Sequence, residues 1–343
     1  MIRVLALVEG VDDASVRLRV KPLGLALGAL GVALEVQPIG ASGPVRWAQF
    51  GAARDHDVVW WQRRLPQPWE CARLRAVARR LLVDLDDAVW RRPAEPHSAW
   101  WRRVRLRALL ARADVITVGA AALAAELAAD FPALPSVTVL PTPCLAPPFR
   151  AAASSAAPLL AWVGQPATWR YAIAARDDWE VVARAVPSAR WRCVGAPAGA
   201  ERAFQDGPLA GRVECVAWSE TREATALDEA WVGLAPLPDD PWTRGKCAAR
   251  LQSCLARGMA VWAAPVGAQA ELIERYLGGE SRRLALGGTA AVVAWLAAPE
   301  AARMRSAGVA AAIATERSAE RLAAAWLRLA LPGAAVAGRG GAR

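Results

Sequence analysis

Two loops of the sequence carry the glycine, hydroxyl and basic residues that bind phosphate groups. Each loop follows an apolar run and precedes a helix-like stretch. Backbone amides at a helix start favour an anion, and a glycine lets the anion approach the backbone. We therefore predict that both loops bind a phosphorylated ligand. The residues are Gly164, Thr168 and Arg170 in WVGQPATWRY (162–171), and Arg244, Gly245 and Lys246 in PLPDDPWTRGKC (236–247).

Lys246 is the most informative of these basic residues. Lysines and arginines together number 42, and the only lysines are Lys21 and Lys246. An ammonium group is a compact point charge, whereas a guanidinium is a planar fork. A lysine retained where nearly every basic residue is an arginine predicts a direct phosphate contact, and chance placement is the alternative.

Short apolar runs, separated by alanine-rich helical stretches, must position these loops. Runs of even hydrophobicity are typical of strands buried on both faces, and helices between them indicate parallel crossovers. A proline-rich stretch at 142–158 interrupts the series. We predict two doubly wound α/β domains, at 1–150 and 151–315, and a disordered tail at 332–343. The runs are 3–8, 32–36, 57–61, 81–85, 114–119, 137–141, 159–164, 190–195, 213–218, 231–236, 259–265 and 283–287.

Several function classes lack their sequence signals. No GxxxxGK[ST] loop, early GxGxxG or GxSxG turn is present, which argues against ATP hydrolysis, hydride transfer and common hydrolases. Two histidines are too few for a histidine-rich metal site. Six cysteines without a C-x2-C pair, and the lack of an export signal, predict free thiols in a reducing cytoplasm.

The net charge of +10 is concentrated in one span. Residues 63–112 contain thirteen arginines against five acidic residues. Within this span, Trp100 and Trp101 share one helical arc beside arginines, a pattern that predicts contact with an anionic membrane surface. An arginine-rich helix packed on its own domain is the alternative. We expect no nucleic-acid binding, because no helix-turn-helix, zinc or aromatic-sheet signature accompanies the charge.

At 236–267, PLPDDPWTRGKCAARLQSCLARGMAVWAAPVG resembles the donor-site segment of GT-B glycosyltransferases, specifically the large retaining group called family 4. Glu271 follows it, and three other segments fall in the family's order: LLVDLDDAVW (81–90), ADVITVGAAALAAEL (113–127) and VECVAWSE (213–220). The resemblance covers most of the chain. It implies the GT-B architecture, with two Rossmann-like domains facing across a cleft and a last helix at 316–331 that crosses back to the first domain.

The resemblance also implies what the site residues do. The second domain would bind a nucleotide-diphosphate sugar without a metal or cofactor, because basic side chains and helix amides stabilise the diphosphate. Arg170, Arg244 and Lys246 would surround the diphosphate, with Arg170 and Lys246 acting in catalysis. The other implied donor contacts are Gly164 and Thr168 at the diphosphate, Val194, Gly195 and Trp218 at the nucleobase, and the 239–246 loop, with Asp240 and Gly245, at the sugar. Gln165, Ser253 and Glu271 are further positions implied to bind the donor. Trp169, Trp218 and Trp242 are candidates for stacking on sugars.

Three positions depart from the family pattern. The family's Glu-x7-Glu pair falls on Gly245 and Ser253, and an arginine that often follows the first glycine of the domain is Gln165. Without these carboxylates, the donor site lacks the groups that would bind the sugar and ribose hydroxyls. A catalytically degenerate GT-B scaffold or binding subunit is therefore the alternative to an active enzyme.

The first domain supplies candidates for the acceptor side. Asp13, Ser15 and Arg17 follow the first apolar run, and Arg17 either holds an anion or lies on a solvated helix face. Asp86 follows a buried strand and is expected to orient an acceptor hydroxyl, with His97 as an alternative base. The prediction is a cytoplasmic glycosyltransferase, peripheral at the inner membrane face, that acts on a glycan or lipid-linked acceptor of the envelope polysaccharide type.

Overall fold

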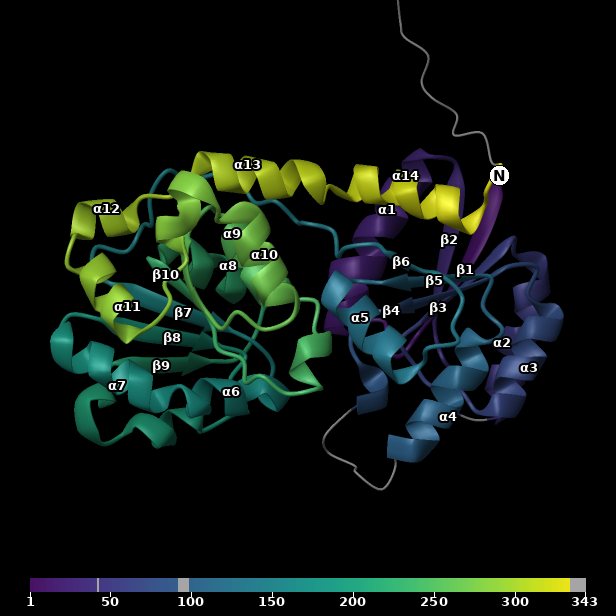
Figure 1. Cartoon of the computed structure of the whole chain (residues 1–343), viewed down its shortest axis with the longest axis horizontal. Coiled ribbons are helices and arrows are strands. Elements are labelled where there is room, and N and C mark those ends of the chain that lie inside the picture. The colour runs from purple at the N-terminus through teal and green to yellow at the C-terminus, as the bar shows by residue number, and fades with distance from the viewer. Residues whose placement is uncertain (42, 92–98, 334–343) are drawn as a thin grey trace, which may run out of the picture. The chain divides into compact units, whose positions relative to one another are not determined.

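The computed structural model describes residues 1–41, 43–91 and 99–333, and divides them between two compact units (Figure 1). Unit 1 comprises the described residues of 1–145, 240–247 and 317–343, and unit 2 comprises 146–239 and 248–316. The sequence placed 240–247 inside the second domain, whereas the structure groups them with the first. Most of the tail expected at 332–343 lies outside the described residues.

Unit 1 is built on one parallel sheet in the order β2-β1-β3-β4-β5-β6, as expected for a doubly wound domain. Its central strands are buried along their whole length, which explains their even hydrophobicity. All six apolar runs predicted before the linker form strands. Their bounds are β1 Ile2–Val8, β2 Val32–Pro38, β3 Val58–Gln62, β4 Leu81–Leu85, β5 Val115–Val118 and β6 Val137–Val139.

The helices of unit 1 include the last helix of the chain. In this helix, α14 (Ala319–Ala330), Trp326 packs against Trp60 of β3 with ring centroids 5.2 Å apart, and both rings are fully buried. Figure 1 shows α14 beside α1. The other helices are α1 Lys21–Ala29, α2 Gly43–Ala52, α3 Pro68–Val77, α4 Ala99–Leu110 and α5 Ala121–Asp130, and a π-helical stretch, Val16–Val20, precedes α1.

Unit 2 holds a second parallel sheet, in the order β11-β10-β7-β8-β9. Its strands are β7 Leu159–Val163, β8 Arg190–Val194, β9 Val213–Val216, β10 Val232–Ala235 and β11 Ala260–Ala263. Its helices are α6 Trp169–Ala174, α7 Arg176–Ala185, α8 Glu220–Glu229, α9 Ala249–Leu255, α10 Ala268–Tyr276, α11 Thr289–Leu296, α12 Pro299–Arg303 and α13 Ala307–Glu316.

The strand predicted at 283–287 is wrong. Residues Gly279–Leu284 form a 3-10 helix, and only Ala285 makes an isolated bridge, to Val261. The run is short and ends at Gly287, with Gly288 directly after it, which disfavours a continued ladder.

Candidate functional site

The carboxyl edge of the unit 2 sheet brings two of the predicted glycines together. Gly164 follows β7, where a Cβ atom would lie 2.3 Å from the Trp162 ring and 2.7 Å from Nη2 of Arg250. Gly195 follows β8 with φ +84°, where a Cβ atom would lie 2.1 Å from the carbonyl oxygen of Gly164. Both positions therefore require glycine, and the two loops meet backbone to backbone.

The hydroxyl of Thr168 holds its own loop in place. Its Oγ1 donates to the Gln165 carbonyl at 3.0 Å and accepts from the Gln165 amide at 3.1 Å. It also accepts from Nη2 of Arg250 at 3.3 Å. Thr168 therefore organises the loop around Arg250, whereas the side chain of Gln165 is exposed.

Arg170 and Arg250 are the basic residues that the fold places near this loop. The exposed Arg170 donates to the Tyr171 hydroxyl at 3.0 Å, with its guanidinium 5.0 Å from that ring. Arg250, on α9, donates from Nε to the Val163 carbonyl and lies 4.8 Å from the centroid of the Trp162 ring. Sequence reasoning missed Arg250, because nothing local distinguishes it from the other arginines.

Arg250 has no carboxylate within ion-pair distance among the described residues. Burial lowers the pKa of Arg250 to about 10, so the group stays charged at neutral pH. Buried charges are usually paired, since removing an ion from water is costly. Glu223 acts on this charge electrostatically without forming an ion pair. The carboxyl end of β7 thus holds a partly exposed arginine whose guanidinium forms no ion pair with a described carboxylate.

Trp218 lies where the sequence placed it, next to Gly195. The Trp218 Cβ is 3.4 Å from the position of a Cβ on Gly195, and its ring is partly exposed. Its Nε1 donates to Glu223 at 2.7 Å. Of the other stacking candidates, Trp169 packs against Trp162 in the core and Trp242 is also buried, so neither offers an open stacking face.

Ser253 and Glu271 lie on helices of unit 2. The Ser253 hydroxyl donates to the Ala249 carbonyl one turn back in α9, at 3.2 Å. Glu271 is in the first turn of α10, after Gly267. The Ser253 hydroxyl is therefore used within its own helix.

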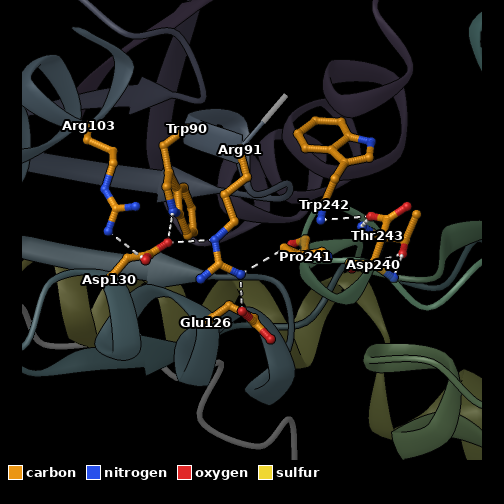
Figure 2. Close-up of polar contacts among 9 residues, drawn as sticks. All are labelled: Trp90, Arg91, Arg103, Glu126, Asp130, Asp240, Pro241, Trp242 and Thr243. Atoms are coloured by element: carbon orange, nitrogen blue, oxygen red, sulfur yellow. Dashed lines mark hydrogen bonds and ion pairs between the residues drawn. The ribbon is translucent and has the colours of Figure 1, made fainter. Parts of the chain in front are cut away.

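The segment 240–247 is a turn held by its own aspartate (Figure 2). The Asp240 carboxylate accepts from the amides of Trp242 and Thr243, at 2.9 and 2.8 Å. Nη1 of Arg91 donates to the Pro241 carbonyl at 3.3 Å. Asp240 therefore stabilises the turn, a role the sequence did not indicate.

Gly245 and Lys246 contact residues that follow β4. A Cβ on Gly245 would lie 2.4 Å from the Ala88 Cβ, which explains the glycine by packing. Lys246 Nζ lies 3.5 Å from Oδ1 of Asp87 and 4.7 Å from the centroid of the Trp242 ring. Burial raises the pKa of Asp87, although Lys246 beside it acts in the opposite direction. The rare lysine thus pairs with a carboxylate of unit 1, and Arg244 beside it is exposed.

The acceptor-side candidates gather at the carboxyl edge of the unit 1 sheet. The buried Ser15 accepts from Arg63 at 2.8 Å, and Arg63, with φ +66°, also lies 3.3 Å from Asp87. Oδ1 of Asp86 accepts from Gln62 at 3.4 Å. Asp13 begins the turn that leads to Arg17, whose amide donates to the Asp13 carbonyl at 2.9 Å. His97 lies outside the described residues.

Asp84 has a structural role beneath this edge. It is fully buried and accepts from Nε and Nη2 of Arg19 at 2.7 and 2.6 Å, and from Thr117 at 2.6 Å. Among described residues, no three His, Cys, Asp or Glu side chains are grouped to hold a metal ion.

A second network that the sequence did not reveal surrounds Asp130 at the end of α5 (Figure 2). Asp130 accepts from Trp90 Nε1 at 2.6 Å, Arg91 Nε at 2.5 Å and Arg103 Nη2 at 2.6 Å. Arg91 also pairs with Glu126. Arg91 thus joins α5 to the turn that contains Pro241.

On α4, Trp100 and Trp101 are 61% and 54% exposed, whereas Leu106, Leu109 and Leu110 are buried. The two rings are in edge contact, with centroids 4.3 Å apart. The leucine face therefore packs on unit 1 and leaves the tryptophan pair in solvent. No described helix combines the length and apolar character needed to cross a membrane.

No protein-family model and no curated protein matches the sequence. Solved structures do match. Sucrose-phosphate synthase from Thermosynechococcus elongatus has a TM-score of 0.69 at 16% identity, covering 96% of this chain and 98% of that one. HepE from Anabaena, in complex with UDP and glucose, has a TM-score of 0.64 at 12% identity, with 96% and 99% covered. AviGT4, a glycosyltransferase involved in avilamycin A biosynthesis, has 0.59 at 16%, with 96% and 98% covered. The predicted fold class is confirmed, and this chain has the GT-B glycosyltransferase fold.

Proposed function

We propose that this chain is a glycosyltransferase that moves a sugar from a nucleotide-diphosphate donor to a hydroxyl acceptor. The observation that carries the proposal is the carboxyl edge of the unit 2 sheet, where Gly164 and Gly195 meet beside Arg250, a guanidinium that forms no ion pair with a described carboxylate. Ligands bind at this edge in open α/β sheets. HepE, which shares the fold, has been solved with UDP-glucose.

The reaction we propose is retaining and needs no metal, as in the family that the sequence resembles. Fixed basic side chains and backbone amides stabilise a departing diphosphate as a cation does. Arg250 and Arg170 supply charge at unit 2. Lys246 and Arg63, with Asp86 and Asp87, provide a charged edge in unit 1 that suits a hydroxyl-rich acceptor.

We further propose that the acceptor is a glycan or a lipid-linked glycan, and that residues 63–112 contact the cytoplasmic face of an anionic membrane. The exposed tryptophan pair on α4 beside Arg105 and Arg107 supports this. Substituting Trp100 and Trp101 by alanine should abolish binding to anionic vesicles and leave donor binding intact. Unchanged vesicle binding would remove the membrane part of the proposal.

The first test is donor binding. Thermal unfolding would be followed with UDP-, GDP-, ADP- and dTDP-sugars, each with EDTA and with Mg²⁺, and a donor that binds should raise Tm. That donor is then used in a transfer assay with glycan acceptors, and the anomeric configuration of the product is read by NMR. No Tm shift with any donor would contradict the proposed function.

The second candidate function is a binding subunit without turnover. It is favoured by Ser253 and Gly245, which stand where the resembling family has glutamates. This candidate predicts donor binding without transfer or hydrolysis. Measurable release of nucleoside diphosphate from the bound donor would exclude it.

A further inference from the structure

We propose that Arg250 of α9 is the residue that holds the diphosphate of the donor, at the carboxyl end of β7. The inference rests on the proposed function and names the charge on which that function depends. It assigns to a helical arginine the role that the sequence analysis gave to Arg170, Arg244 and Lys246 together.

Arg250 is fixed in place on three sides. Nε donates to the Val163 carbonyl, Nη2 donates to Thr168 Oγ1 at 3.3 Å, and the guanidinium lies over the Trp162 ring. Nη1 makes no hydrogen bond to any described residue. A guanidinium held in this way presents its remaining donors in a fixed direction, which suits a multidentate phosphate contact.

The loop beside Arg250 packs closely against the guanidinium. A Cβ on Gly164 would lie 2.7 Å from Nη2 of Arg250 and 2.3 Å from the Trp162 ring, so glycine lets the backbone lie directly against both. The buried Gly195, with its positive φ, allows the next loop to approach the Gly164 carbonyl. The two glycines therefore hold Arg250 against the end of β7, where Gly164 itself is partly exposed.

Arg250 is the basic candidate whose guanidinium is held at the end of β7 itself. Lys246 pairs with Asp87 and contacts Trp242, both in unit 1. Arg170 is exposed, donates to the Tyr171 hydroxyl and lies over that ring. The hydrogen-bond partners of Arg250 are neutral and Glu223 acts on it only electrostatically, so an arriving diphosphate would not have to break an ion pair.

The test compares three variants, Arg250→Met, Arg250→Lys and a control, Arg184→Met. Arg184 is an exposed arginine of unit 2 that pairs with Glu180 on α7. Isothermal titration would use the nucleoside diphosphate that binds the wild type most tightly among UDP, GDP, ADP and dTDP, together with the matching nucleoside. Far-UV circular dichroism and urea unfolding would establish that each variant is folded.

We expect Arg250→Met to weaken diphosphate binding by about 10- to 100-fold, as for loss of a charge-assisted hydrogen bond, and to leave nucleoside binding within about twofold. Arg250→Lys should recover part of the loss, and Arg184→Met should bind like the wild type. Should Arg250→Met fail to fold, Arg250→Lys against the same ligand pair serves as the test, with a smaller selective loss expected.

Two other outcomes are separable. A wild-type chain that binds no nucleotide contradicts the proposed function itself, and the Arg250 assignment with it. A wild-type chain that binds the diphosphate, with Arg250 variants unchanged or losing nucleoside equally, overturns the Arg250 assignment alone and leaves the proposed function standing.

Discussion

Replacing Gly245 by alanine tests whether this glycine serves packing or ligand binding. The added Cβ would lie 2.4 Å from the Ala88 Cβ, 3.2 Å from the Ala88 amide nitrogen and 3.3 Å from its Cα. Two carbons pack best at about 3.5 to 4.0 Å. The turn at 243–245 must therefore move by more than 1 Å, roughly the gap between these values.

The magnitude follows from known costs of overpacking. A methyl group forced into a packed contact costs about 1 to 3 kcal/mol. For a domain of this size that corresponds to a fall in Tm of about 2 to 12 °C. Exchanging the methyl group in the double variant Gly245→Ala, Ala88→Gly should recover most of the loss, with a coupling energy of at least about 1 kcal/mol.

The unfolding free energies of the wild type, both single variants and the double variant, measured in urea, complete this double-mutant cycle and give the coupling energy. Donor titration of the same proteins separates the two roles, because a ligand-contacting Gly245 would lose affinity on substitution while stability stayed constant. A Gly245→Ala protein as stable as the wild type, or a double variant without recovery, would refute the packing argument.

Three further perturbations test other parts of the structure. Burial raises the pKa of Asp130, but the bonds from Arg91 outweigh this and hold it below its ordinary value. Its stabilisation is therefore present above the unfolded pKa of about 3.9 and is lost as pH falls through the lower folded pKa. Urea midpoints of wild type and Asp130→Asn should therefore differ at pH 6 and converge once the pH is below that folded pKa; a difference that did not change with pH would contradict this. Arg305→Met strips the donor from three backbone carbonyls that end α8 and should lower the unfolding free energy by about 1 to 3 kcal/mol; an unchanged midpoint would contradict this. Trp326→Ala should cost about 3 to 5 kcal/mol, with Trp100→Ala as the control expected within about 0.5; equal effects would show that α14 is not part of the unit 1 core.

The strands could be predicted from the sequence because burial on both faces leaves a local signal. Trp60, Trp162 and Trp191 occupy strand positions and are fully buried, as the flat runs indicate. The run at 283–287 is the exception. It is apolar too, but it ends at Gly287 and Gly288 follows, and only Ala285 pairs with a neighbour, Val261.

The division of the chain into units could not be predicted locally. Residues 240–247 lie between β10 and α9 of unit 2 along the chain, so proximity in sequence assigns them to unit 2. In the structure these residues contact Ala88, Asp87 and Arg91. The separation in sequence is about 150 residues, the value for the Arg91–Pro241 hydrogen bond. Contacts between residues so far apart in sequence leave no periodic pattern of apolar residues from which they could be predicted.

The comparison of Lys246 with Arg250 shows which property of a basic residue points to an anion. Lys246 was selected from the sequence because lysine is rare in this chain. Rarity is a property of the composition, however, and in the structure the Lys246 ammonium pairs with the carboxylate of Asp87. Arg250 is one of many arginines, yet it forms no ion pair with a described carboxylate, and Glu223 acts on it only electrostatically. A guanidinium that forms no ion pair can bind an anion without breaking one, which is why Arg250 and not Lys246 carries the proposed diphosphate contact. That inference needs the three-dimensional neighbours of the residue, which composition does not supply.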